Sequence, residues 1–187
     1  MCTRCKWVDT SKPDYVEYHD KEWGVPVYDD TIFFEFLILE SAQAGLSWYT
    51  ILKRREGYRN AFSDFNPQIV SKFDSEKVEA LMNDTGIIRN RAKIEAAINN
   101  AQRFLEIQNQ HGSFSNFIWS YVDSLPLDTR NEHEMPPATT LLSDKVAKDL
   151  KQRGFKFLGS TTIYAFLQAT GIVNDHDLDC YCRLTRN

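Results

Sequence analysis

Apolar residues recur along most of the chain at spacings of three and four, the period of helices with one buried face. The alternation typical of strands is nearly absent, so the pattern predicts a helical protein. The expected helices cover residues 13–22, 30–44, 47–62, 75–82, 90–110, 114–122, 143–152 and 161–170. Polar residues and prolines at 126–137 predict a long loop between two helical groups.

The most apolar segment, IFFEFLILESAQAG, has apolar residues on nearly every side, as expected of a helix buried in the middle of a domain. Glu40 interrupts it, because Glu40 shares a face with Phe33, Leu37 and Ala44 at helical spacings. An acid there is costly to bury. It therefore has a hydrogen-bond partner, lies partly exposed at the helix end, or serves a pocket that binds a cation.

Aromatic residues are dense where the chain is otherwise polar. They are Trp7, Tyr15, Tyr18, Trp23 and, directly after a glycine turn in AGLSW, Trp48. Such rings would form the walls of a site for a flat ligand. Packing in the core is an equally good explanation when these residues are considered alone.

With 187 residues and 42% apolar content, the chain is expected to form one compact domain or two small lobes that share a core. No stretch reaches the length of a membrane span, and the start MCTRCKWVD lacks the apolar region of a signal peptide. We therefore expect a cytoplasmic protein with no membrane partner. The net charge of −4 argues against a protein that coats nucleic acid indiscriminately.

Basic residues gather in three places, which we expect to be solvated helix faces. They are Lys53, Arg54, Arg55 and Arg59, then Arg89, Arg91 and Lys93, then Lys148, Lys151, Arg153 and Lys156.

The four cysteines lie in two pairs near opposite ends of the chain, which favours a metal site over scattered core thiols. Cys5 and His19 are near one end. His176 and Cys180, spaced i and i+4, would share a face of a helix near the other. These residues form a tetrahedral two-cysteine, two-histidine set, which would be structural because no position stays open for water.

Two points stay open at the metal site. Cys2 and Cys182 compete as ligands, and the cysteines could also be incidental. The turn GFKFLGST between two predicted helices would offer backbone amides to a phosphate, although this pattern is weak by itself. By themselves, these features would also fit a zinc-stabilised DNA-binding or adaptor module without catalysis, or a zinc hydrolase.

The chain closely resembles the 3-methyladenine DNA glycosylase I family through RCKWV, YHDKEWGVP, LESAQAGLSW, GIIRNRAKI, RGFKFLGST and GIVNDH, over about Cys5 to Cys182. The resemblance implies an all-α fold of the helix-hairpin-helix superfamily, a single domain over 1–187 with its hairpin at about 148–170, and zinc joining the two terminal segments. It implies a monomeric enzyme that removes 3-methyladenine from double-stranded DNA and leaves an abasic site.

The resemblance also implies roles for individual residues. It assigns structural zinc to Cys5, His19, His176 and Cys180. It assigns catalysis to Glu40 and Tyr18 and recognition of the base to these two residues and Trp48. Trp7, Tyr15 and Trp23 would line or support the pocket. It assigns DNA contacts to Gln43, Gly45, Leu46, Lys156, Gly159, Ser160 and Thr161.

Two positions bear on strand cleavage. The wider superfamily has an aspartate where this chain has Asn174, after Val173, and lyase-type relatives have a lysine approximately where this chain has Thr161. The resemblance therefore implies base removal without strand cleavage.

Overall fold

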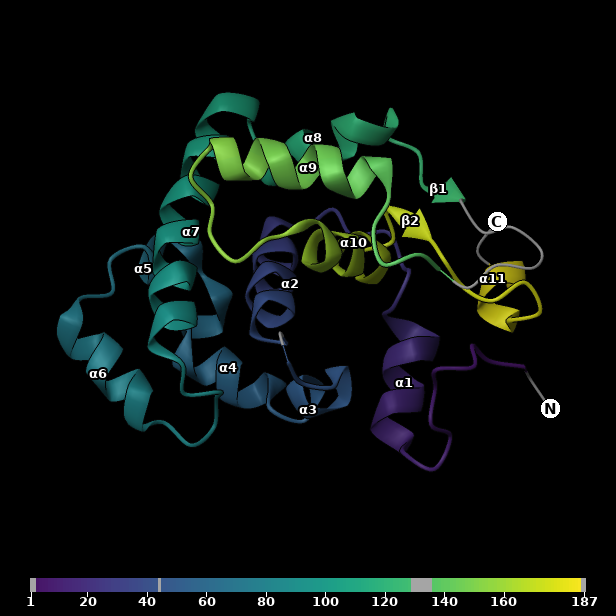
Figure 1. The fold of residues 1–187 in the computed structure, drawn as a ribbon, viewed down its shortest axis with the longest axis horizontal. Helices are drawn as coiled ribbons and strands as arrows, with labels where there is room; N and C mark the ends of the chain where they lie inside the picture. Colours follow the sequence, from purple (N-terminus) through teal and green to yellow (C-terminus); the bar gives the residue numbers. More distant parts are fainter. Residues whose placement is uncertain (1–2, 44, 129–135, 186–187) are drawn as a thin grey trace.

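The computed structural model describes residues 3–43, 45–128 and 136–185, and these form a mostly helical fold (Figure 1). The elements are α1 (Pro13–Lys21), α2 (Asp30–Ala42), α3 (Trp48–Leu52), α4 (Arg55–Ala61), the 3-10 turn η1 (Ser63–Phe65), α5 (Pro67–Val70), α6 (Ser75–Asn83), α7 (Arg91–His111), α8 (Phe114–Trp119), the 3-10 turn η2 (Ser120–Val122), β1 (Leu127–Asp128), α9 (Leu141–Gln152), α10 (Ser160–Ala169), β2 (Val173–Asn174) and α11 (Tyr181–Thr185).

Helix α2 lies in the middle of the fold and contacts α7, α8 and α10 (Figure 1). It begins where the side chain of Asp29 accepts hydrogen bonds from the amides of Thr31 and Ile32. All residues from Phe33 to Ala42 are buried, so the prediction of a buried central helix is confirmed. Glu40 therefore belongs to a helix that is buried at every position from Phe33 onward.

The prediction of one helix over 47–62 is wrong, because the chain turns between α3 and α4 at Lys53 and Arg54. Arg54 has non-helical angles, φ −103° and ψ 2°, and its guanidinium donates to the carbonyl of Thr85 at 2.7 Å. The change of direction lets Ile51 of α3 and Tyr58 of α4 both reach the core.

Two short helices and two short strands were not expected from the pattern. Helix α5 follows Asn66, whose side chain caps it, and α11 ends the described chain. The strands β1 and β2 form one parallel pair with Leu127 opposite Val173. This pair joins the chain after η2 to the chain after α10. The long loop predicted at 126–137 lies partly outside the described residues.

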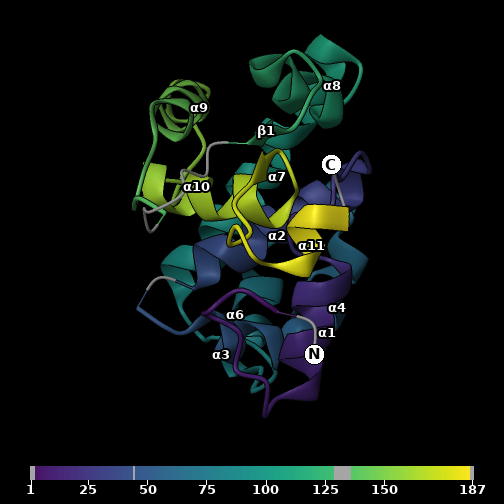
Figure 2. The same cartoon turned by 90° about the vertical axis from the view of Figure 1, so that its right-hand side faces the viewer.

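The main hydrophobic core is one connected cluster that extends from α1 to β2, and a smaller cluster contains Cys5, Cys180 and Cys182. Helices α1 and α11, from opposite ends of the sequence, lie on the same side of the molecule (Figure 2). Within the described ranges, no helix combines the length and apolar character needed to cross a bilayer.

The expectation of solvated basic faces holds for some residues only. Lys148, Lys151 and Lys156 are exposed. Arg55, in contrast, is largely buried and forms ion pairs of 2.6 Å with both Glu22 and Glu35. The first basic group is therefore partly a structural ion network, which sequence spacing alone could not reveal.

Gly57 of α4 packs directly against the backbone of Gly86. A Cβ atom at Gly57 would lie 2.3 Å from the Gly86 carbonyl oxygen, far inside van der Waals contact. We therefore expect Gly57→Ala to lower the free energy of unfolding by at least about 1 kcal/mol in urea denaturation. A glycine-to-alanine change inside a helix otherwise stabilises by about 1 kcal/mol.

Asn60→Ala is the matched control, because Asn60 is exposed on the same helix. It should leave stability unchanged or raise it slightly. Equal stabilisation by both substitutions would show that the two glycine backbones can separate freely.

Candidate functional site

The carboxyl group of Glu40 lies at the C-terminal end of α2 and is only 5% exposed. Within the described part of the chain, its buried Oε2 atom has no hydrogen-bond partner. Burial raises the pKa of Glu40 to about 8. A buried acid with an unsatisfied oxygen atom destabilises a fold and is typical of a functional position.

Aromatic rings stand beside this carboxyl group. The rings of Tyr18 and Trp48 are 5.6 Å apart, and Phe36 stacks on Trp48 at 6.4 Å with an interplanar angle of 16°. Burial, and next the charge of Glu40, raise the pKa of Tyr18 well above its usual value. The Nε1 atom of Trp48 is buried without a hydrogen-bond acceptor among the described residues.

The predicted residues Tyr18, Glu40 and Trp48, on α1, α2 and α3, therefore lie in one region. Tyr18 packs on Trp48, and its pKa responds to the charge of Glu40. Their arrangement suits a flat ligand with a polar edge, because aromatic walls and an unused carboxyl oxygen lie together. Phe36 was missed from the sequence, although it precedes Glu40 by four residues on α2 and so shares its face.

The other predicted pocket aromatics pack closer to the cysteine and histidine cluster. The ring centroid of Trp7 lies 5.0 Å from that of Trp23 and 5.2 Å from that of Tyr15. The ring of Trp23 meets that of His176 edge-on, with 4.7 Å between centroids. Tyr15 continues the row to Tyr49, at 5.3 Å. A supporting role is compatible with these contacts, and a direct role in binding a base stays a prediction.

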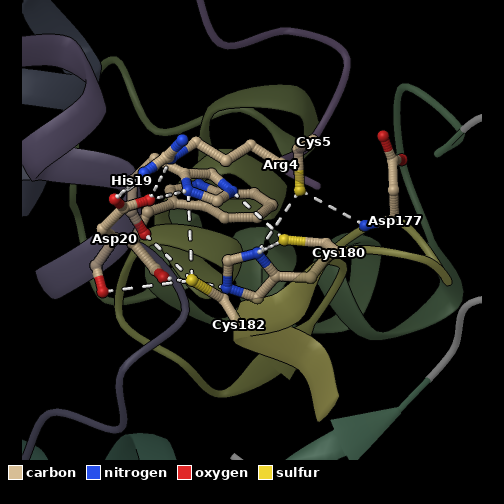
Figure 3. A network of polar contacts seen from close by, with 9 residues as sticks. Arg4, Cys5, His19, Asp20, Asp177, Cys180 and Cys182 are labelled. Atoms are coloured by element: carbon tan, nitrogen blue, oxygen red, sulfur yellow. Dashed lines mark hydrogen bonds and ion pairs between the residues drawn. The ribbon is translucent and has the colours of Figure 1, made fainter. Parts of the chain in front are cut away.

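Cys5, His19, His176 and Cys180 come together in a buried cluster, with their four candidate ligand atoms within 4.8 Å of one another. Figure 3 shows three of them, Cys5, His19 and Cys180, with their side chains close together. Cys5 Sγ lies 3.3 Å from His176 Nδ1, and Cys180 Sγ lies 3.5 Å from His19 Nε2. Two thiolates and two imidazoles around a tetrahedral zinc ion would be separated by about 3.3 to 3.8 Å. The donor types therefore fit zinc, and the separations of 3.3 and 3.5 Å agree with this range.

The second nitrogen of each imidazole is also fixed. His19 Nδ1 lies 2.8 Å from the carboxylate of Asp20, and His176 Nε2 lies 3.1 Å from the carbonyl of Trp23. Arg4 holds Asp20 through bonds of 2.8 Å and keeps its pKa well below the usual range. Such partners orient metal-binding histidines, and here they aim the other ring nitrogens at the thiols.

The predicted helix carrying His176 and Cys180 is wrong, since α11 begins only at Tyr181. A turn joins the two residues instead, in which the amide of Cys180 donates to the carbonyl of Asp177 at 2.9 Å. The amide of Asp177 also donates to Cys5 Sγ at 3.3 Å. The side chains converge because loop hydrogen bonds direct them, and the i, i+4 spacing does not reflect a helix.

Of the two competing thiols, Cys182 lies on another side of His19. Its Sγ is 4.0 Å from His19 Nδ1, the nitrogen that faces Asp20. Among the described residues, the candidate metal ligands that it groups with are His19 and Asp20. Cys2 lies outside the described residues.

The turn after α2 contains three of the predicted DNA contacts. Gln43 continues the helical conformation, and Gly45 has φ +82°, which favours glycine. Leu46 is 39% exposed at the surface. Ala44, predicted to share the Glu40 face, lies outside the described residues.

The second glycine turn lies between α9 and α10. Gly159 is the N-cap residue of α10, and no side chain caps this helix. The first amides of a helix have no partner within the helix. The hydroxyl of Ser160 donates to Asp144 at 2.5 Å and is therefore engaged within the protein. Lys156 and Thr161 are exposed.

Asn174 lies in β2, and the carboxylate nearest to it in sequence is Asp175. Asp175 is buried and accepts hydrogen bonds from Tyr164 and, at 2.7 Å, from Gln168. Both partners lie on α10, so Asp175 is engaged in packing that helix.

Comparison with known proteins places this helical fold in a defined class. Residues 7–183 match the methyladenine glycosylase family. DNA-3-methyladenine glycosylase 1 of Escherichia coli is 48% identical over 181 residues, which cover 96% of each chain. A crystal structure of 3-methyladenine DNA glycosylase I aligns with TM-score 0.92 and 48% identity over 96% of this chain and 99% of that one.

A variant of such an enzyme in complex with 3-methyladenine aligns with TM-score 0.90 and 43% identity, over 93% of this chain and 94% of the other. The similarity thus covers the sequence and the fold nearly from end to end. The chain belongs to the methyladenine glycosylase family.

The raised pKa of Glu40 predicts a pH dependence of stability. Between the usual 4.5 and about 8, the folded protein binds a proton that the unfolded chain releases, so stability falls as pH rises through this window. We expect Glu40→Gln to remove this loss, which amounts to at most about 1.4 kcal/mol per pH unit. Urea denaturation of both proteins at pH 5 and pH 8 measures it.

Glu106→Gln, an exposed change on α7, serves as the control and should keep the pH dependence of the unchanged protein. Parallel stability curves for the Glu40→Gln and unchanged proteins would show that Glu40 titrates normally.

Proposed function

We propose that this protein excises 3-methyladenine from alkylated double-stranded DNA by hydrolysing the N-glycosidic bond of a flipped nucleotide. The observation that carries the proposal is the buried Glu40 carboxyl group, with an unpartnered oxygen, beside the rings of Tyr18 and Trp48. Family membership supports the same reaction.

Methylation at N3 gives adenine a positive charge and weakens its glycosidic bond, so the base leaves as a neutral molecule without needing an acid. The protein has to extrude the nucleotide, which costs a few kcal/mol of unstacking, and hold the cation in the pocket. Tyr18 and Trp48 provide ring faces, and contact between a cation and a ring contributes about 0.5 to 2 kcal/mol.

Glu40 accepts hydrogen bonds from the amino edge of the base in this mechanism. Because its pKa is about 8 in the free protein, the carboxyl group is mostly protonated at pH 7. A cationic base favours the ionised form, so binding would release a proton. Neutral adenine does not offset the ionisation of a buried acid, and discrimination follows from that difference.

We propose that α9, the glycine turn and α10 act as the helix-hairpin-helix, at about 148–170. The first amides of α10, with Lys156, Gly159, Ser160 and Thr161, would hold a phosphate of the DNA backbone. Gln43, Gly45 and Leu46 would enter the duplex beside the flipped nucleotide. Because this chain has Asn174 in place of an aspartate and Thr161 in place of a lysine, we propose base removal without strand cleavage. We also propose that the protein acts as a monomer.

We propose a structural zinc ion held by Cys5, His19, His176 and Cys180. Burial raises the pKa of the Cys5 thiol, and a divalent cation would offset this by binding the thiolate. When bound, zinc would supply a cross-link between the two ends of the chain. Four protein ligands leave no open position, which disfavours a hydrolase that uses zinc for chemistry.

The unchanged protein should release 3-methyladenine from alkylated duplex DNA without cutting the strand. Glu40→Gln should lower kcat/KM by about 10- to 100-fold, because a hydrogen bond to a charged group contributes about 1.5 to 3 kcal/mol. Chromatography of the released base measures both effects. Glu106→Gln is the control and should match the unchanged protein.

Absence of base release from the unchanged protein would favour a DNA-binding or adaptor module. Equal activity of Glu40→Gln would remove Glu40 from the mechanism.

Elemental analysis should find one zinc ion per chain. Cys180→Ser should lose the metal and lower the melting temperature, because metal binding contributes to folding free energy. Cys182→Ser, the matched control two residues later, should retain the zinc. A folded, zinc-free protein that has lost only turnover after chelation would instead support metal-assisted hydrolysis.

A further inference from the structure

The ammonium group of Lys93 donates a hydrogen bond of 2.9 Å to the main-chain carbonyl of Ala42, across 51 residues of sequence. Ala42 is the last residue of α2. It follows Glu40 by two positions and directly precedes the turn that contains Gly45 and Leu46. The bond thus falls between the carboxyl group of the pocket and the exposed turn.

The last carbonyls of a helix have no partner within the helix. A lysine there satisfies one of them and interacts favourably with the negative end of the helix dipole. Lys93 therefore restrains the end of α2 and the direction in which the chain leaves it. After the turn, Ser47 caps α3 through the amide of Thr50, and Trp48 begins that helix.

Lys93 is itself held in a fixed place. The side chain of Asn90 caps α7 by accepting from the amide of Lys93 at 3.1 Å, and the next residue, Ile94, is buried. Upstream, the amide of Ile88 donates to the hydroxyl of Tyr58 on α4 at 3.2 Å. The start of α7 is thus tied to α4 before its lysine reaches α2.

We propose that Lys93 is a positioning residue, which sets the turn after α2 so that Leu46 can enter the duplex while the base occupies the pocket. This inference rests on the proposed function. It separates two tasks: Glu40, Tyr18 and Trp48 bind the base, and Lys93 determines whether the turn can support the flipped nucleotide. A contact between Lys93 and a DNA phosphate is the competing explanation.

Lys93→Met tests the proposal, because methionine keeps most of the aliphatic stem and loses the ammonium group. We expect kcat/KM on 3-methyladenine DNA to fall by about tenfold, since misplaced groups reduce catalysis. The affinity for free 3-methyladenine, measured by tryptophan fluorescence, should change by less than about twofold. Lys93→Arg, which retains a donor and the charge, should recover part of the activity.

Lys77→Met is the matched control. Lys77 occupies the third position of α6, as Lys93 does in α7, and its amide is likewise bonded to the preceding cap residue, Asp74. Its ammonium group lies over the ring of Phe73, far along the chain from α2. This variant should keep both the excision rate and the affinity for the base.

Salt dependence separates positioning from phosphate contact. A lost phosphate contact lowers the slope of log affinity against log salt by about one, whereas positioning leaves it unchanged. In a double-mutant cycle with Leu46→Gly, the effect of Lys93→Met should shrink, because both act through the turn.

A reduced salt slope, an equal loss of affinity for the free base, or full additivity with Leu46→Gly would each overturn the proposal. Base release by the unchanged protein tests the proposed function separately, so the two failures are distinguishable.

Discussion

The burial of one carboxyl group in an apolar helix is the constraint on which the rest of the structure depends. Glu40 lies in the last turn of α2, where every residue from Phe33 onward is buried. An acid with an unpartnered oxygen destabilises the fold, and the contacts of α2 with α7, α8 and α10 provide the offsetting apolar burial. A less central helix would let water reach the carboxyl group and remove its raised pKa.

Helix α1 connects this pocket to the cysteine and histidine cluster through two adjacent residues. Tyr18 packs toward Trp48, whereas His19 faces Cys180. Trp23 adds a second connection, since its carbonyl accepts from His176 and its ring packs on the same histidine. Anything that fixes the cluster therefore fixes one wall of the pocket, which gives a structural metal ion, as proposed, an indirect effect on base binding.

Helical spacing predicted the long helices and the shared face of Glu40 because a central helix and its core residues follow local rules. The break at Arg54 could not be predicted, since it depends on the carbonyl of Thr85. The helix proposed for His176 and Cys180 was wrong because their spacing also fits a turn. Lys93 resembled a solvated basic residue, and only its main-chain partner on α2 reveals another role.

In the proposed mechanism, selectivity arises from a carboxyl group that is mostly neutral in the free protein and ionises when a cationic base binds. A permanently charged carboxylate would attract any cation and would need a compensating partner when the site is free. With a pKa of about 8, Glu40 avoids that need, and only a ligand that carries a positive charge and fits between the rings favours its ionisation. The proposed mechanism thus recognises shape and charge together, because the buried oxygen atom that would meet the base lies in the same region as the rings of Tyr18 and Trp48.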